Sequence, residues 1–231
     1  MTKVLKIIHY SLFNIHFVLY LCANFYSAMR FNAPDFLRYL YPSFIWSFED
    51  ETEGVFLTFD DGPRPEVTPW VLNELDRFNA KATFFCLGKN IEMYPELFNE
   101  IKKRGHAVGN HSYSHIKGWG MDTGMYIRDV DFANDMIDNN LYRPPYGRIG
   151  PHQGKVLSER YKIIMWNLLS RDYSRRLSGK NCARNVIKYV KPGDIVVFHD
   201  SIKASKNLWY ALPLVLEHIY KQGWKCKPIE L

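Results

Sequence analysis

Two short stretches of the sequence carry side chains whose types and spacing suit a metal ion. Asp60 and Asp61 are adjacent in the stretch Thr-Phe-Asp-Asp-Gly-Pro. Neighbouring carboxylates repel each other unless a cation or a proton lies between them, although Asp-Gly is also a frequent turn dipeptide. His111 and His115 lie four residues apart, and two imidazoles at this spacing can reach one metal ion from a helical turn or a tight loop. A polar turn and two surface histidines are the alternatives for each stretch taken alone.

Taken together, the two stretches supply a chemically complete set of three ligands. One Asp and two His leave coordination positions open for water and substrate, which is typical of catalytic rather than structural metal sites. The four cysteines lie far apart and form no Cys-x-x-Cys pair, so the sequence indicates neither a thiolate zinc site nor a redox motif. The ligand types suit zinc, cobalt and other first-row ions.

Three further residues could support hydrolytic chemistry beside such a metal. Arg143 precedes two prolines that stiffen its loop, and a guanidinium there can orient a carboxylate through paired hydrogen bonds. His199 follows the apolar run Val-Val-Phe and is well placed as a general acid. Asp172 follows another apolar run, and its carboxylate could raise the pKa of an imidazole and keep it protonated. A solvent-facing arginine and a core histidine are the alternatives.

The pattern that must position these residues is an alternation of short apolar runs and amphipathic stretches. Strands are predicted at residues 55–59, 82–85, from 108, 161–166, 194–198 and 224–228. Helices are predicted from Thr68, expected as an N-cap, and at about 95–104, 122–138, 183–190 and 211–222. This order favours an α/β fold with a largely parallel sheet, open or closed into a barrel. The candidate residues then follow strand ends, so they converge on one rim.

The ordered motifs resemble those of a known family. Thr-Phe-Asp-Asp-Gly-Pro, His-Ser-x-x-His, Arg-Pro-Pro-Tyr, Arg-Asp-Tyr and Val-Phe-His-Asp follow one another in the sequence as they do in polysaccharide deacetylases of carbohydrate esterase family four, the NodB-homology domain. The resemblance covers residues 54–231. It implies a distorted (β/α) barrel of seven strands, and hydrolysis of N-acetyl or O-acetyl groups on sugars with a divalent metal ion.

The resemblance also implies a role for each matching residue. Asp60 would be the general base and Arg143 would hold it in place. The metal ligands would be Asp61, His111 and His115. His199 would be the general acid, tuned by Asp172, and the backbone N–H of Tyr146 would help to stabilise the oxyanion. The sequence departs from the family pattern at Leu169, Tyr173 and Val197, which we interpret as changes to the pocket wall that bear on substrate preference.

These observations predict a metal-dependent hydrolase that deacetylates a carbohydrate such as an N-acetylglucosamine-containing glycan. Zinc is expected in preference to cobalt, nickel or manganese. The alternative is a catalytically silent carbohydrate-binding protein that keeps the metal. A net charge of +6 could favour nucleic acid, but no motif matches and no such partner is expected. Trp119, Tyr146, Trp166 and Tyr173 are expected near the rim, where aromatic faces can stack on sugars, although a core position is the more frequent role of such residues.

The first 30 residues differ from the rest of the sequence in their low content of charged side chains. Residues 7–29 carry no charged side chain, a length that can span a bilayer, although histidines and asparagines interrupt the run. We predict residues 1–30 to be a helical extension, either a weak membrane anchor or a stretch upstream of a true start at Met29, in preference to a cleaved signal. Membrane contact is expected only through 7–29, with a cytoplasmic or weakly membrane-associated protein favoured over a secreted one. Residues 31–231 are expected to form the catalytic domain, and the sequence does not indicate its oligomeric state.

Overall fold

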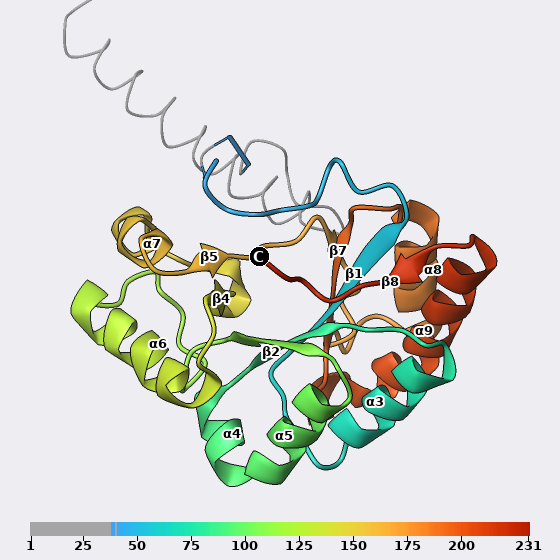
Figure 1. Ribbon diagram of the computed structural model, residues 1–231, viewed down its shortest axis with the longest axis horizontal. Helices are drawn as coiled ribbons and strands as arrows, with labels where there is room; N and C mark the ends of the chain where they lie inside the picture. Colours follow the sequence, from blue (N-terminus) through green and yellow to red (C-terminus); the bar gives the residue numbers. More distant parts are fainter. Residues whose placement is uncertain (1–37, 40) are drawn as a thin grey trace, which may run out of the picture.

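One curled parallel β-sheet forms the centre of the molecule. The computed structural model describes residues 38–39 and 41–231. Seven strands follow one another in the order β5-β4-β3-β2-β1-β7-β6, and β8 pairs with β1 outside this path (Figure 1). All of these pairings are parallel. The strands are β1 (Gly54–Asp60), β2 (Thr83–Cys86), β3 (Ala107–Asn110), β4 (Leu141–Tyr142), β5 (Lys162–Ile163), β6 (Leu168–Leu169), β7 (Ile195–His199) and β8 (Lys225–Cys226).

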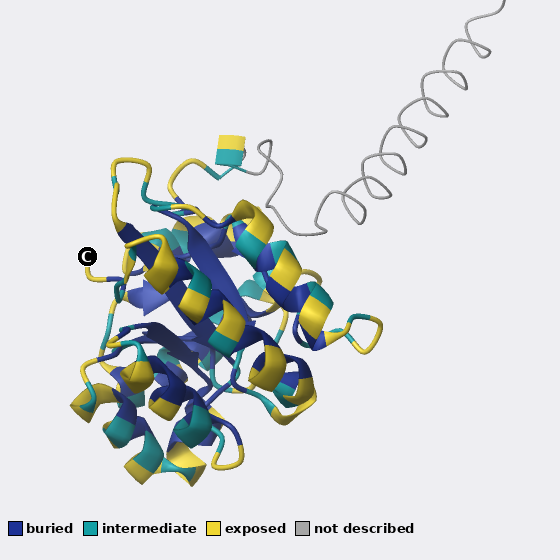
Figure 2. Ribbon diagram, turned by 90° about the vertical axis from the view of Figure 1, so that its right-hand side faces the viewer, coloured by how far each residue is buried: buried dark blue, intermediate teal, exposed yellow. Residues whose placement is uncertain are grey.

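Helices connect the strands and surround the sheet (Figure 1). They are α3 (Thr68–Arg77), α4 (Gly88–Met93), α5 (Pro95–Lys103), α6 (Thr123–Ile137), α7 (Pro151–Ser158), α8 (Gly179–Tyr189) and α9 (Ile202–Lys221), with the 3-10 helix η1 (Pro145–Gly147). Figure 2 shows the strands buried and the helices banded, with exposed residues on their outward sides. Helices with one apolar face pack in this way when they cover a parallel sheet.

The alternation of side chains along β7 divides the core between the two faces of the sheet. Val196 and Phe198 pack with helix residues in one apolar cluster, whereas Ile195 and Val197 belong to a second cluster. Because strand side chains alternate between faces, His199 continues the face of Ile195 and Val197. The catalytic candidates therefore extend the second apolar face at the end where the strands finish.

The register of the central strands brings two of the candidates side by side. The Cα of Asp60 at the end of β1 pairs with that of His199 at the end of β7. β1 is buried along its whole length, which explains why it reads as a continuous apolar run rather than an alternating one. The carboxyl ends of the parallel strands thus share one rim.

The segment just before β1 lies across the open part of the curl. Ile45 forms an isolated parallel bridge with Ile164 next to β5, and Ser47 forms an antiparallel one with Asp194 next to β7. Backbone hydrogen bonds fix the first bridge, from Ile45 N–H to the Ile163 carbonyl at 2.9 Å and from Met165 N–H to the Ile45 carbonyl at 2.7 Å. This segment therefore links two distant parts of the sheet.

The fold confirms the predicted distorted (β/α) barrel. Several local predictions were wrong. The Thr68 hydroxyl caps no helix, because it donates to Asp200 Oδ2 (2.6 Å) and accepts from Arg64 N–H (2.7 Å); α3 begins at Thr68 without a side-chain cap. Helices α4 and α7 were missed, since short helices depend on tertiary packing more than on their own pattern. Helix α9 begins nine residues earlier than predicted, at Ile202 rather than Ala211.

The N-terminal predictions concern residues that the structure does not describe. The helical extension at 1–30 and the domain boundary at 31 lie outside the described residues. Within the described residues, no helix combines the length and apolar character needed to cross a bilayer.

Candidate active site

Asp61, His111 and His115 come together at the rim as the sequence predicts. Asp61 Oδ1 lies 3.1 Å from His115 Nε2 and 3.8 Å from His111 Nε2. One ligand atom from each residue lies within 4.8 Å of the other two. Asp61 Oδ1 is buried and has no hydrogen-bond partner. A buried carboxylate oxygen without a donor, facing two imidazole nitrogens, is the environment that a divalent cation would complete.

A tight loop after β3 holds the two histidines. Ser112 and His115 have φ angles of 63° and 62°, a left-handed conformation that needs local support in residues other than glycine. That support comes from two hydrogen bonds, Ser112 N–H to Asn110 Oδ1 at 2.7 Å and His115 N–H to Ser112 Oγ at 3.1 Å. The histidines therefore lie in a loop rather than on a helical turn.

The ring nitrogen of His111 that faces away from Asp61 is hydrogen-bonded to the backbone. Its Nδ1 lies 2.7 Å from the backbone carbonyl of Arg143, so the ring donates there and keeps the Nε2 lone pair for the metal side. Burial lowers the pKa of His111 to about 4. Burial alone would raise the pKa of Asp61, but His115 together with the charges of His199 and His111 holds it well below its usual range. Both side chains are therefore in the unprotonated form that binds metal.

Arg143 holds Asp60 from a fully buried position. Its Nη1 donates to Asp60 Oδ1 at 2.8 Å and to Thr58 Oγ1 at 2.6 Å. The remaining guanidinium nitrogens donate to the Ile164 and Met165 carbonyls, and the group lies 4.1 Å from the centre of the Phe85 ring. With so many contacts, the guanidinium has one position. Asp60 is thus anchored independently of the three metal-ligand candidates.

His199 and Asp172 form a second ion pair beside the metal-ligand candidates. His199 Nδ1 lies 2.8 Å from Asp172 Oδ1, and the His199 backbone N–H donates to Asp172 Oδ2 at 2.8 Å. Asn207 Nδ2 donates to the Asp172 carbonyl and so fixes the loop. Burial works to lower the pKa of His199, but the Asp172 carboxylate outweighs it, with help from Asp61 and Asp60, and raises the pKa to about 9. The imidazole is therefore protonated at neutral pH.

Tyr146 lies beside the metal-ligand candidates. It has a φ of 60° within η1, and the centre of its ring lies 4.5 Å from that of His115. Its side chain is 58% exposed. The backbone of this residue is therefore held in an unusual conformation at the edge of the site.

One cleft of about 1080 Å³ joins these residues. Asp60, Asp61, His111, His115, Tyr146 and His199 line it, while Arg143 and Asp172 lie fully buried beneath. The four aromatic residues expected at the rim, Trp119, Tyr146, Trp166 and Tyr173, also line the cleft. The structure thus brings together all eight site residues that the sequence predicts.

Sequence reasoning missed the residues that support the Asp60-Asp61 turn. Asn90 Nδ2 donates to the Asp61 carbonyl at 2.7 Å. Asp200 N–H donates to the Asp60 carbonyl at 3.1 Å, and the buried Asp200 side chain packs against Gly62. Burial raises the pKa of Asp200 to about 7. The position of Asp200 next to His199 is a signal that could have drawn attention to it, whereas nothing in the sequence marks Asn90.

Comparison with known proteins identifies the family of the chain. The sequence model of the polysaccharide deacetylase family matches residues 49–159. A peptidoglycan-N-acetylglucosamine deacetylase of Bacillus cereus is 30% identical over 194 residues, which cover 78% of this chain and 88% of that protein. The chain belongs to the polysaccharide deacetylase family.

Two further peptidoglycan deacetylases are similar to the chain in sequence or in fold. The peptidoglycan-N-acetylmuramic acid deacetylase PdaC of Bacillus subtilis is 28% identical over 177 residues, which cover 74% of this chain but only 37% of that protein. The crystal structure of the Bc1960 peptidoglycan N-acetylglucosamine deacetylase, bound to 4-naphthalen-1-yl-N-oxidanyl-benzamide, superposes with a TM-score of 0.78 at 27% identity, covering 85% of this chain and 95% of that one. The fold and the catalytic class are therefore those of a deacetylase family.

Proposed function

We propose that the protein is a metal-dependent hydrolase that removes N-acetyl, or O-acetyl, groups from an N-acetylglucosamine-containing glycan. The observation that carries the proposal is the presence, at one cleft, of three clustered metal-ligand candidates and two separate hydrogen-bonded ion pairs, Asp60–Arg143 and His199–Asp172. Binding of a metal requires neither pair, whereas hydrolysis of an amide uses both.

Asp61, His111 and His115 would hold one divalent ion, zinc in preference to cobalt, nickel or manganese. When bound there, the ion supplies Lewis acidity toward the acetyl carbonyl and toward the attacking water. The unpartnered Asp61 Oδ1 and the Nε2 atoms on the metal side fit this role.

Asp60 acts as the general base. Its carboxylate takes a proton from the water whose oxygen forms the new bond to the acetyl carbon. Arg143 keeps the carboxylate in position through the 2.8 Å hydrogen bond to Oδ1. The negative charge that develops on the former carbonyl oxygen receives a hydrogen bond from the Tyr146 backbone N–H, which favours the transition state over the ground state.

His199 acts as the general acid. As the carbon–nitrogen bond breaks, the imidazolium gives its proton to the departing nitrogen, so that an amine and acetate leave rather than an amide anion. A pKa of about 9 keeps His199 protonated beforehand. Asp172 stabilises that protonated state from the opposite side of the ring.

The relatives support peptidoglycan as the first substrate to examine. Two of them are named for the removal of acetyl groups from peptidoglycan sugars. The aromatic residues of the cleft offer faces on which sugar rings can stack. An acetylated carbohydrate is therefore the proposed partner.

The test is release of amine and of acetate by the zinc-loaded full chain, from acetylated chitooligosaccharides and from peptidoglycan glycan strands. Asp60→Asn should lower the rate by roughly 10²–10⁴-fold while the zinc content stays at one ion per chain. Asp50→Asn, which alters an exposed acid outside the cleft, serves as the control and should keep full activity.

Two outcomes would contradict the proposal. Near-full activity of zinc-loaded Asp60→Asn would remove Asp60 from the role of base. A wild-type protein that binds zinc and acetylated glycans but releases neither amine nor acetate from any of them would instead be a silent carbohydrate-binding protein.

A further inference from the structure

Four cationic side chains lie around the metal-ligand candidates, each in a different segment that follows a strand. Lys117 follows β3, Arg148 follows β4, Arg171 follows β6, and Lys203 follows β7 in the first turn of α9. All four line the cleft. The positive charge is therefore distributed around the rim rather than gathered on one loop.

Few acidic side chains lie in the described part of the cleft. Among the described residues that line it, Asp60 and Asp61 are the only acids. Asp60 is hydrogen-bonded to Arg143, and Asp61 is a metal-ligand candidate. Asp172 lies beneath the cleft, paired with His199. A concave surface with this charge pattern concentrates anions.

Two of the cations lie over aromatic rings on opposite sides of the site. The Arg148 guanidinium is 6.0 Å from the centre of the Trp119 ring, and Lys203 Nζ is 5.5 Å from that of Tyr173. The first pair comes from loops after β3 and β4, and the second from segments after β6 and β7. Because β1 lies between these strands in the sheet, the two pairs flank Asp60 and Asp61.

An aromatic ring beside a cation has a specific use in carbohydrate binding. The ring provides a face for an uncharged sugar ring, while the cation meets an anionic substituent on that sugar. The Trp119 indole N–H donates to the Ile149 carbonyl at 2.8 Å, which ties the ring to the loop that carries Arg148. Trp119 and Arg148 therefore form one unit.

We propose that this cleft selects acetylated glycans that carry carboxylates on the sugars next to the one that is deacetylated. The proposal rests on the deacetylase function above and adds the class of its substrate. The Trp119–Arg148 and Tyr173–Lys203 pairs bind the flanking sugars, and Lys117 adds to the positive field.

The test compares two substrates that differ only in charge. One is a tetrasaccharide of alternating N-acetylglucosamine and N-acetylmuramic acid, and the other is the same tetrasaccharide with its muramyl carboxyls converted to primary amides. The ratio of kcat/KM for the acid to that for the amide is measured with the zinc-loaded full chain. We expect a ratio well above one at low salt that falls as ionic strength rises, because exposed charges are screened.

Substitutions then assign the preference to particular side chains. Arg148→Gln combined with Lys203→Gln should lower the ratio by roughly tenfold, since an exposed ion pair is worth about twofold to fivefold. Arg148→Glu with Lys203→Glu should lower it further. Lys188→Gln is the matched control, because Lys188 Nζ lies 4.9 Å from the Tyr189 ring centre but does not line the cleft. It should leave both kcat/KM values unchanged.

Each remaining outcome contradicts one claim. A wild-type protein that deacetylates both substrates equally, or prefers the amide, would overturn the charge selection and leave the deacetylase function intact. A wild-type preference that survives in the folded Arg148→Gln/Lys203→Gln variant would remove these two cations from the proposal. Zinc-loaded protein without activity on either tetrasaccharide or on chitooligosaccharides would overturn the proposed function itself.

Discussion

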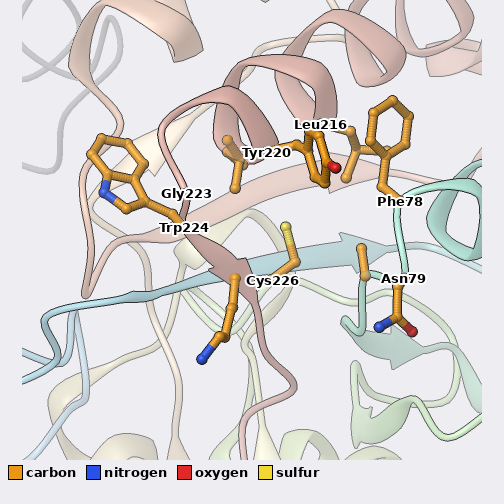
Figure 3. A pocket seen from close by; sticks show the side chains of 10 residues that line it. Phe78, Asn79, Leu216, Tyr220, Gly223, Trp224 and Cys226 are labelled. Carbon is orange, nitrogen blue, oxygen red and sulfur yellow. The ribbon is translucent and has the colours of Figure 1, made fainter.

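Two hollows in the described part of the chain lie at opposite ends of the sheet. The cleft with the candidate site is lined mainly by residues at or after the carboxyl ends of the strands. A smaller pocket of about 280 Å³ lies between the end of α9 and the start of β2 (Figure 3). The residues of β8 line this pocket. Because β8 pairs with the first residues of β1, the pocket lies at the amino end of the sheet.

The chemistry of the two hollows differs more than their size. Figure 3 shows Phe78, Leu216 and Tyr220 near Cys226 in the smaller pocket. Burial raises the pKa of the Cys226 thiol to about 12, so it stays protonated and unreactive. The cleft instead gathers an unpartnered carboxylate oxygen and an imidazole whose pKa is raised to about 9. In a barrel-like α/β fold, function gathers at the carboxyl end and stability at the amino end.

The largest effect that this contrast predicts is the loss of a metal ligand in the cleft. Asp61→Asn keeps the size of the side chain but removes the charge that faces His111 and His115. Activity should fall by roughly 10³-fold or more, since Lewis-acid stabilisation of several kcal/mol is lost at about tenfold per 1.4 kcal/mol. Zinc content and amine release, measured on the same sample, check this expectation.

The matched control for Asp61→Asn is Glu92→Gln. Glu92 Oε2 accepts a hydrogen bond from the Tyr113 hydroxyl on the histidine loop, but Glu92 does not line the cleft. It should keep both zinc and activity. If Asp61→Asn retains stoichiometric zinc and wild-type activity, Asp61 is not a ligand and the contrast between the two ends loses its main support.

The second prediction concerns pH. Asp172→Asn removes the carboxylate that raises the pKa of His199 and leaves burial, which lowers it. The alkaline limb of kcat/KM should therefore move to lower pH, because His199 must be protonated to act as the acid. A pH profile from 6 to 10 for wild type and variant measures the shift. An unchanged limb would show that His199 is not the acid.

In the metal-free protein, the free energy of unfolding should also depend on the His199–Asp172 ion pair. The pKa of His199 is raised in the folded state from an ordinary 6.5 to about 9. Its contribution to stability is therefore fully present below pH 6.5 and is lost as the pH rises through about 9. The difference in unfolding free energy between wild type and Asp172→Asn should shrink across that window. Urea unfolding at pH 6, 7.5 and 9 measures it.

The sequence was sufficient to predict that the candidate residues converge, because they follow the ends of parallel strands. Asp60 and His199 each follow an apolar run, and parallel strands place their carboxyl ends together. The pairing of their Cα atoms across β1 and β7 confirms this reasoning. What the sequence could not provide was the support from distant residues, such as Asn90 behind Asp61, because no local pattern marks a contact between separate loops.

The sequence did not predict the shortest strands, for a related reason. β4 and β6 have two residues each, too few to show an alternating pattern. Helix α9 was predicted too short because its first half carries Trp209 and Tyr210 on an exposed face, which obscures the buried stripe. Tertiary packing, rather than local preference, defines these elements.

The third prediction tests the turn that holds Asp60 and Asp61. A Cβ added at Gly62 would lie 2.0 Å from Asp200 Oδ2, so Gly62→Ala should lower stability by about 1–3 kcal/mol, as overpacking does, and should also lower activity. Gly120→Ala on the cleft side is the comparison, because Gly120 has a φ of +79° but open space around it. It should cost about 1–2 kcal/mol, which is the strain of a left-handed backbone without a steric clash. Denaturant unfolding ranks the two variants.

A double variant separates the steric effect from other causes. Asp200→Ala removes the carboxylate that a Cβ at Gly62 would meet, so Gly62→Ala should cost less in that background than in wild type. Equal costs in the two backgrounds would mean that Asp200 does not constrain the turn.

The smallest expected effect lies in the amino-end pocket. Tyr220 is 69% exposed, and its ring centre lies 6.3 Å from that of Phe78. Tyr220→Ala should change the unfolding free energy by about 0.5 kcal/mol or less, as exposed positions do. It should leave kcat/KM within about twofold, since Tyr220 lines the smaller pocket and not the cleft. The same amine-release assay measures it. A tenfold fall in kcat/KM with stability unchanged would mean that this end communicates with the catalytic end, and the division of the molecule into a reactive and a supporting end would not hold.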